Sequence, residues 1–105
     1  MAVTSKALFR GAATTTTTTV LYTVPASTTT VVTNIAVTNT GSSSYTFTLG
    51  MGPAAGQVSL HTTTTIAANT TVYIDCKQVL SATNTITGGA SNTAVNFHIS
   101  GVEIA

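Results

Sequence analysis

The chain contains very little charge. Only 5% of its 105 residues are Asp, Glu, Lys or Arg, whereas a globular domain usually carries about 25%. The complete charged set is Lys6, Arg10, Asp75, Lys77 and Glu103. Because binding to phosphates requires clustered Lys and Arg, this set excludes nucleic acid as a partner. A surface made of Thr, Ser, Asn and Gly has little charge to repel its neighbours, and it suits a protein packed beside other subunits.

Cysteine and long apolar runs are also scarce. The single cysteine, Cys76, excludes an intrachain disulfide framework. No run approaches the about 20 apolar residues of a membrane-spanning helix, and no apolar segment follows Lys6 and Arg10 as in a signal peptide. We therefore expect one soluble domain without a membrane partner, made in a reducing compartment.

Threonine is the most prominent residue that is present. It makes up roughly a quarter of the chain, while Glu, Lys, Gln and Arg are rare. Thr and Val fit a pleated strand better than a helix because they are branched at Cβ. An apolar fraction of 43% argues against disorder. The composition thus predicts a folded, all-β protein.

Alternation of apolar and polar residues predicts strands along most of the chain. The expected strands lie at 5–10, 18–24, 30–38, 44–51, 57–63, 70–76, 84–87 and 93–104. The turn-rich segment 39–43 predicts a hairpin between its two neighbouring strands, and 66–69 reads as a connection.

Alternate positions on these strands form the faces expected in the core. They are Val20, Tyr22 and Val24; Val31, Thr33, Ile35 and Val37; Tyr45, Phe47, Leu49 and Met51; Val58, Leu60 and Thr62; Val72, Ile74 and Cys76; and Val95, Phe97 and Ile99. After Ser100 the apolar positions move to Val102 and Ile104, which predicts a β-bulge at Gly101.

About eight strands with turn signals every 8–12 residues predict a single antiparallel β-sandwich, Ig-like or jelly-roll-like. Residues 1–19 are expected to be an N-terminal arm or first strand followed by a Thr-rich connection, and 20–105 the sandwich domain. The run Thr14–Thr19 has no periodicity, and both a strand extension and a flexible connection remain open.

Few residues suggest a metal or cofactor site. His61 and His98 fall on the polar sides of their strands and could bind a metal with Asp75 or Glu103. No H-x-H or similar spacing supports a cluster, so we favour solvent or interface residues and expect neither metal nor cofactor.

Catalytic patterns are equally weak. Cys76 shares a face with Val72 and Ile74, where a thiol behaves as a small buried hydrophobe rather than a nucleophile. Serine is common, but no G-x-S-x-G elbow is present, and nothing brings the two carboxylates together as a glycosidase requires. The glycines of 50–52 and 88–89 are interpreted as turn glycines, since no lysine or helix start accompanies them. We predict no enzyme and no catalytic residue.

The N-terminal segment is the one candidate contact region. Lys6, Leu8, Phe9 and Arg10 could form an arm that orders on a partner, or an ordinary edge strand. Both alternatives remain open from the sequence.

Several stretches carry a resemblance to a known family. They are Leu21–Pro25, Val31–Thr40, Ile66–Thr71, Val79–Leu80 and Val95–Ile104. Together they resemble a recurrent module of virion structural proteins of tailed bacteriophages, similar to small head-decoration proteins and to minor tail or fibre modules. The acidic Gly-Asp pair usual in this family after the segment matching Val79–Leu80 is replaced here by Ser81–Asn84, and this departure leaves a calcium or acid-dependent role without support.

The resemblance implies a virion protein, made in the cytoplasm of a bacterial host. Our leading hypothesis is a capsid decoration (auxiliary) protein that forms a symmetric homo-oligomer, a trimer first, and docks on the major capsid protein. The alternative is a minor tail, collar or fibre component that binds host-surface glycans. Carbohydrate sites usually contain an aromatic platform, and the sequence offers little support for one. It contains no tryptophan, and Tyr22, Tyr45 and Tyr73 lie on different predicted strands.

Overall fold

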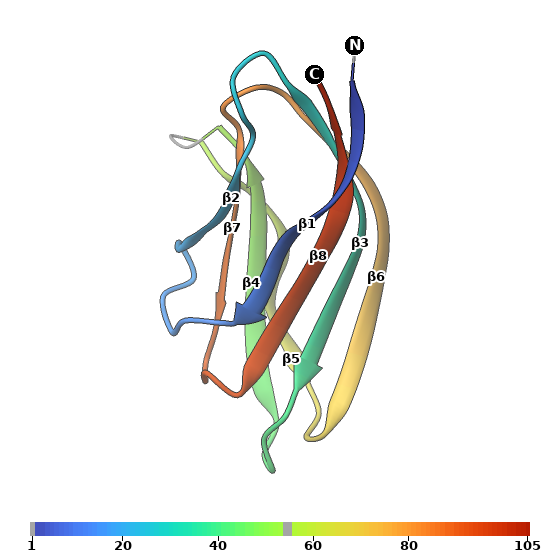
Figure 1. The fold of residues 1–105 in the computed structure, drawn as a ribbon. Coiled ribbons are helices and arrows are strands. Elements are labelled where there is room, and N and C mark those ends of the chain that lie inside the picture. Colours follow the sequence, from blue (N-terminus) through green and yellow to red (C-terminus); the bar gives the residue numbers. More distant parts are fainter. Residues whose placement is uncertain (1, 54–55) are drawn as a thin grey trace.

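The structure is a computed structural model that describes residues 2–53 and 56–105, and only the backbone of residue 76. Two antiparallel four-stranded sheets pack face to face (Figure 1). The front sheet contains, in spatial order, β1 (Val3–Ala12), β8 (Val95–Ile104), β3 (Thr29–Asn39) and β6 (Thr70–Leu80). The back sheet contains β2 (Val20–Thr23), β7 (Thr85–Ala90), β4 (Tyr45–Gly52) and β5 (Val58–Ile66). The prediction of an all-β sandwich is confirmed.

Strand pairing identifies the sandwich as a jelly roll. The first strand pairs with the last, β2 with β7, β3 with β6, and β4 with β5. The chain therefore folds as one long antiparallel hairpin rolled around a core, and β3–β8 and β4–β7 pairing completes the two sheets. Eight strands in this arrangement form a jelly roll, which settles the choice against an Ig-like sandwich.

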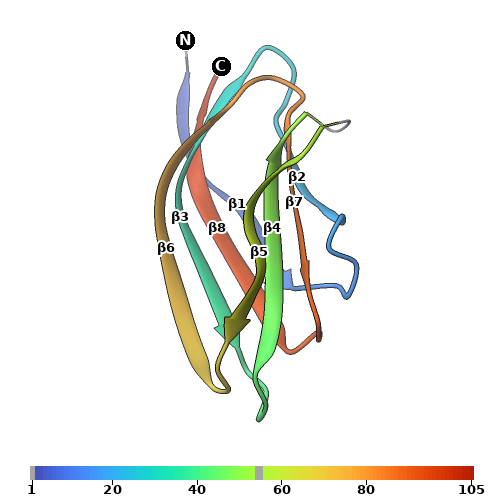
Figure 2. The ribbon, with the colours of Figure 1, turned by 180° about the vertical axis from the view of Figure 1, so that it is seen from behind.

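The predicted hairpin across residues 39–43 is wrong. Its flanking strands form as expected, but β3 lies in the front sheet and β4 in the back sheet (Figure 2). The buried Asn39 amide organises this crossing by donating to the carbonyl oxygens of Ser43, at 2.8 Å, and Ile66, at 3.2 Å. Turn-forming residues predict a reversal of the chain but not which strand the returning segment joins.

The core lies between the sheets. Phe47 of β4 and Phe97 of β8 meet edge to face, with ring centroids 6.3 Å apart. The predicted inward faces of β4 and β8 are confirmed, because the alternate positions Phe47, Leu49, Met51, Val95, Phe97 and Ile99 are buried. Val58 is an exception: it starts the edge strand β5 and is 70% exposed.

The predicted bulge in β8 is wrong, because β8 keeps its inward alternation through the buried Gly101. The irregularities lie in its neighbours, at Leu8 of β1 and at Thr33 of β3. A side chain at Gly101 would clash with the Val31 carbonyl oxygen and approach Leu8 Cδ1 within 2.9 Å. The bare α-carbon therefore gives Leu8 room to enter the core. The shift at Thr33 also turns Val32 inward in place of the predicted Val31.

The glycines interpreted as turn residues lie inside strands. Gly50 and Gly52 belong to β4, while Gly88 and Gly89 belong to β7. A Cβ at Gly89 would lie 2.9 Å from the Thr14 carbonyl oxygen, so this strand glycine allows the threonine run to approach closely.

The threonine run forms a hydrogen-bonded loop rather than a strand extension. Ala90 N donates to Thr14 O at 2.9 Å, and Gly88 N donates to Thr19 O at 3.0 Å. The loop therefore covers the part of the β7 edge that the four-residue β2 leaves unpaired.

Candidate functional site

The described residues contain no pocket, and they contain no group of three His, Cys, Asp or Glu side chains able to hold a metal ion. The two histidines lie on different sheets. His61 of β5 packs on Phe47 at a centroid distance of 5.6 Å, whereas His98 lies on the outer face of β8. The expected burial of the Cys76 thiol lies outside the described side chains. No helix long and apolar enough to cross a membrane occurs in the described ranges.

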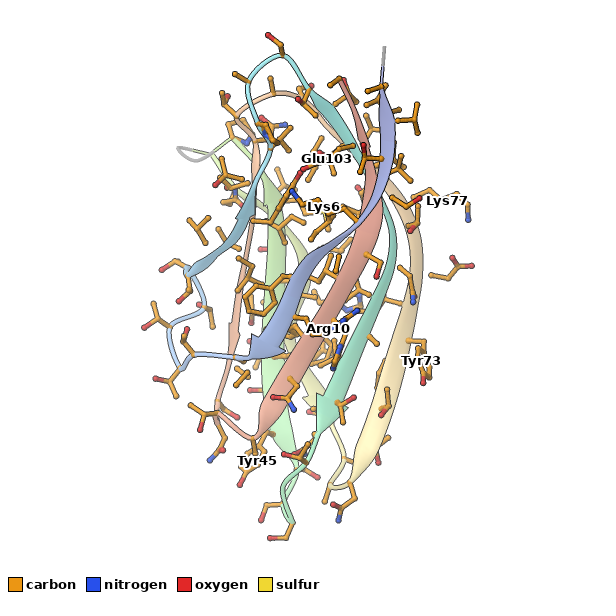
Figure 3. All side chains as sticks on the ribbon, viewed as in Figure 1. Lys6, Arg10, Tyr45, Tyr73, Lys77 and Glu103 are labelled. Carbon is orange, nitrogen blue, oxygen red and sulfur yellow. The ribbon has the colours of Figure 1, made fainter. Side chains whose placement is uncertain are left out.

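Polar side chains from both sheets meet at one end of the sandwich. We call Lys6, Tyr22, Thr30 and Glu103 the inter-sheet cluster. The Tyr22 hydroxyl, from the back sheet, donates to Glu103 Oε2 of the front sheet and lies 2.9 Å from Thr30 Oγ1. Lys6 Nζ lies 3.4 Å from Glu103 Oε2 (Figure 3).

The strand register brings these side chains together. Glu103 pairs with the inward-facing Thr30 on β3, so its side chain also points between the sheets. Lys6 pairs with Gly101, two positions before Glu103, on the same face of the front sheet. Lysine and glutamate therefore lie on neighbouring strands within reach of each other.

The environment of the cluster determines its protonation. Burial raises the pKa of Tyr22 to about 12, and the hydrogen bond to Glu103 adds to this effect. The hydrogen bond from Tyr22, and then the Lys6 ammonium, lower the pKa of Glu103. At neutral pH the tyrosine is therefore a hydrogen-bond donor and the glutamate an ionised acceptor. This arrangement ties the two sheets together.

The outer face of the front sheet carries a different set of side chains. Register places Arg10, His98, Ala36 and Tyr73 side by side on β1, β8, β3 and β6. We call these four residues the front-face row. Tyr73 is 73% exposed, and Figure 3 shows Arg10 and Tyr73 on the two edge strands of the sheet. The row presents a tyrosine ring and an arginine guanidinium, two groups that are enriched in protein interfaces, together with an imidazole.

The two sheets differ sharply in charge. All five charged residues of the chain lie on strands of the front sheet, and the sequences of β2, β4, β5 and β7 contain none. On the back sheet, Gln57 instead bonds to threonines: its Nε2 donates to Thr85 Oγ1 at 2.7 Å, and its Oε1 accepts from Thr87 Oγ1 at 2.9 Å. The back face is therefore polar but uncharged.

The predicted contact segment forms an edge strand. Lys6, Leu8, Phe9 and Arg10 belong to β1, which pairs with β8 along its length. They do not share one surface, because Lys6 belongs to the inter-sheet cluster, Leu8 is 7% exposed and Phe9 packs against the core. Only Arg10 lies on the front-face row. A role of this segment in partner binding stays a prediction.

Sequence reasoning missed the bond between Tyr22 and Glu103. The two residues are 81 positions apart and belong to strands that never pair with each other. One available signal was the rarity of acid in this chain, since a glutamate on a strand in so uncharged a sequence calls for a specific partner.

No family model matches the sequence, and no curated protein matches it either. The fold is shared with viral proteins. The D431N mutant VP2 protein of infectious bursal disease virus, in derived T=1 particles, matches with a TM-score of 0.63 and 11% identity over 98% of this chain.

Two further structures of the same virus agree. The Gx strain matches with a TM-score of 0.59 and 12% identity, and the VP2 subviral particle with 0.57 and 10%, each over 97% of this chain. This chain spans only 30–31% of those three viral chains. At such identity the likeness shows the fold alone, a jelly roll that this chain shares with these viral proteins.

Proposed function

We propose that this protein is a structural component of a virion, namely a capsid decoration (auxiliary) protein of a tailed bacteriophage. The observation that carries the proposal is the complete eight-stranded jelly roll, which aligns over nearly the whole chain with VP2 of infectious bursal disease virus. The scarcity of charge supports the same role, because subunits packed at high density repel one another less when uncharged.

In this role the protein forms a symmetric homo-oligomer, a trimer first, that docks on the major capsid protein and bridges neighbouring capsid subunits. The uncharged back face suits a permanent contact, because no ion must leave water when it is covered. Strand β1 contributes Arg10 as a second contact. Each contact is modest, and repetition over the shell multiplies its effect.

A second candidate is a minor tail, collar or fibre component that binds host-surface glycans. The observation in its favour is Tyr73, an exposed ring in the same cross-strand row as His98 and Arg10, with Ala36 between it and His98. Aromatic faces combined with polar neighbours are suited to stacking on sugar rings.

The copy number per purified particle separates the two candidates. It is measured by quantitative mass spectrometry against the major capsid protein. Hundreds of copies in a fixed ratio to that protein are expected for decoration, a few dozen or fewer would move the protein to the tail, and absence from particles would refute the virion role.

Docking is tested by adding the purified protein to particles that lack it. Wild-type protein should bind and raise the temperature at which the particles release their DNA. Arg10→Glu should bind more weakly with unchanged folding, whereas Thr33→Ala, also at an exposed front-sheet position, should bind normally. Equal binding of Arg10→Glu and wild type would remove β1 from the contact.

A further inference from the structure

Strand β6 is a long edge with no partner on its outer side. It runs over 11 residues, and in the described part of the chain only β3 pairs with it. Figure 2 shows it at the margin of the front sheet, on the outer side of β3. Its outer backbone N–H and C=O groups are thus open to another strand, and the strand contains no proline to block such pairing.

The other edges are less suited to pairing. Leu8 interrupts the register of β1, and β2 has only four residues. In β5, Thr63 has a φ of 46°, and the register with β4 shifts twice. Strand β6 also has one register shift with β3, because Val32 pairs with Gln78 and Asn34 with Asp75. Its two faces nevertheless stay in phase across this shift: Val72, Ile74 and Leu80 face the core, and the odd positions point outward.

The outward positions of β6 are unusually exposed for their chemistry. Tyr73 and Val79 are 73% and 67% exposed, and both are among the few large hydrophobic side chains at the described surface. Between them lie Asp75 and Lys77, whose side chains are 89% and 77% exposed. Along the strand the order is therefore apolar, acidic, basic, apolar.

This order is complementary to its own reverse. In an antiparallel pair of β6 strands with a twofold axis at residue 76, Tyr73 of each copy lies opposite Val79 of the other. Asp75 of each copy likewise lies opposite Lys77 of the other. We infer that β6 is a self-association edge, through which two copies of this chain join their front sheets into one eight-stranded sheet.

Alternative registers are disfavoured. A slip of one residue would place outward side chains of one copy against inward side chains of the other. Moving the twofold axis to residue 75 or 77 would place Asp75 opposite Asp75, or Lys77 opposite Lys77, and directly opposed like charges are destabilising. The axis at residue 76 is the one that pairs both charges and both apolar side chains.

The contact is small, and its strength follows from its size. One strand pair buries less than the roughly 1,600 Å² of a standard interface, and each cross-strand pair adds only about 0.2–1 kcal/mol. The isolated protein should therefore associate weakly, and many copies held on one surface should associate strongly. The inference does not depend on the proposed virion role.

Charge reversal provides the main test, read by sedimentation velocity from micromolar to millimolar concentration. Wild type should show a concentration-dependent association step. Lys77→Asp and Asp75→Lys each make all four central charges alike and should weaken that step by about tenfold or more. The double variant Asp75→Lys/Lys77→Asp restores opposite pairs and should restore association.

A matched control places a charge on a different edge. Thr65→Asp adds an exposed acid to β5 and should leave the association step unchanged. Circular dichroism should show the same fold for all variants, since the substituted side chains are exposed. The inference would be overturned if wild type showed no association step. It would also be overturned if the single charge reversals left the association step unchanged.

Cross-linking tests the register itself. In a Cys76→Ser background, Tyr73→Cys combined with Val79→Cys should form a disulfide-linked dimer under mild oxidation, because cross-strand pairs meet the required geometry. Within one chain the two positions lie six residues apart along a strand and cannot bridge. Either cysteine alone should cross-link poorly, and absence of the linked dimer would refute this register. Because the isolated protein is measured, failure here leaves the virion copy number as an independent question.

Discussion

The hydroxyl of Tyr22 in the back sheet donates a hydrogen bond to the carboxylate of Glu103 in the front sheet. Lys6 Nζ donates to the same carboxylate, and Thr30 Oγ1 bonds to the Tyr22 hydroxyl, so the ionised acid at the margin of the core has two donors, Tyr22 and Lys6. Among the described side chains, no buried nitrogen or oxygen lacks a partner. The inter-sheet cluster is therefore a satisfied polar network, and each of its members can be tested.

Removal of the tyrosine hydroxyl should weaken the contact between the sheets. Tyr22→Phe keeps the ring but leaves Glu103 and Thr30 without this partner, and we expect a loss of about 1–3 kcal/mol in the free energy of unfolding. Urea denaturation measures the loss. Tyr45→Phe is the matched control, since no described hydrogen bond involves the Tyr45 hydroxyl, and an equal loss in both variants would contradict the assignment.

Stability should also fall at alkaline pH. The pKa of Tyr22 is raised to about 12 in the folded protein, so above the ordinary tyrosine pKa of about 10 the unfolded chain ionises first. Stability is therefore fully present below about pH 10 and declines as the pH rises towards 12. Thermal unfolding in this range should show a steeper decline for wild type than for Tyr22→Phe.

The loss of stability at acidic pH, which forms the acidic limb of the curve of melting temperature against pH, should depend on Glu103. Its pKa is lowered in the folded state by Tyr22 and Lys6, so its stabilising effect is present above the unfolded pKa of about 4.3 and is lost as the pH falls through the folded value. Glu103→Gln should flatten this part of the curve of melting temperature against pH. The exposed Asp75→Asn should leave the limb in place; flattening by both variants would point to a general charge effect.

Gly101 should not tolerate a side chain. Gly101→Ala places a Cβ against the Val31 carbonyl oxygen and 2.9 Å from Leu8 Cδ1, and we expect a loss of about 2–3 kcal/mol from overpacking. Gly56→Ala is the control, because a Cβ there has no neighbour within 4 Å. Chemical denaturation of both variants measures the difference in the free energy of unfolding. A Gly101→Ala variant as stable as wild type would show that β1 can move away from the added methyl group.

The buried amide of Asn39 should be required for the crossing between β3 and β4. Asn39→Asp replaces a donor to Ser43 O and Ile66 O with an acceptor, and places a charge where the wild-type side chain is fully buried. We expect a loss of about 2–4 kcal/mol at neutral pH, partly recovered when the acid is protonated. Asn96→Asp, on the outer face of β8, should change stability little by comparison.

Much of the local structure could be predicted. Phe47, Leu49 and Met51 alternate with threonine and glycine, and the strand they predict is β4 with its buried face as expected. Thr33 shows the limit of such reasoning: the inward positions change there from Val32 to Ile35, because the neighbouring strand β8 pairs past it. A shift of that kind depends on another part of the chain and leaves no mark in the alternation.

Composition and alternation, both local properties, were sufficient for an all-β chain of about eight strands with almost no charge on its surface. A β-strand shows its buried face in its own residues, because side chains alternate between the two faces of a sheet. The pairing partner of a strand is not visible in its own residues in this way. The turn residues at 39–43, for example, fit a hairpin and a crossing between sheets equally well. Burial of all the apolar faces at once selected the jelly roll, and that packing brought Tyr22 to Glu103 and left β6 at an open edge.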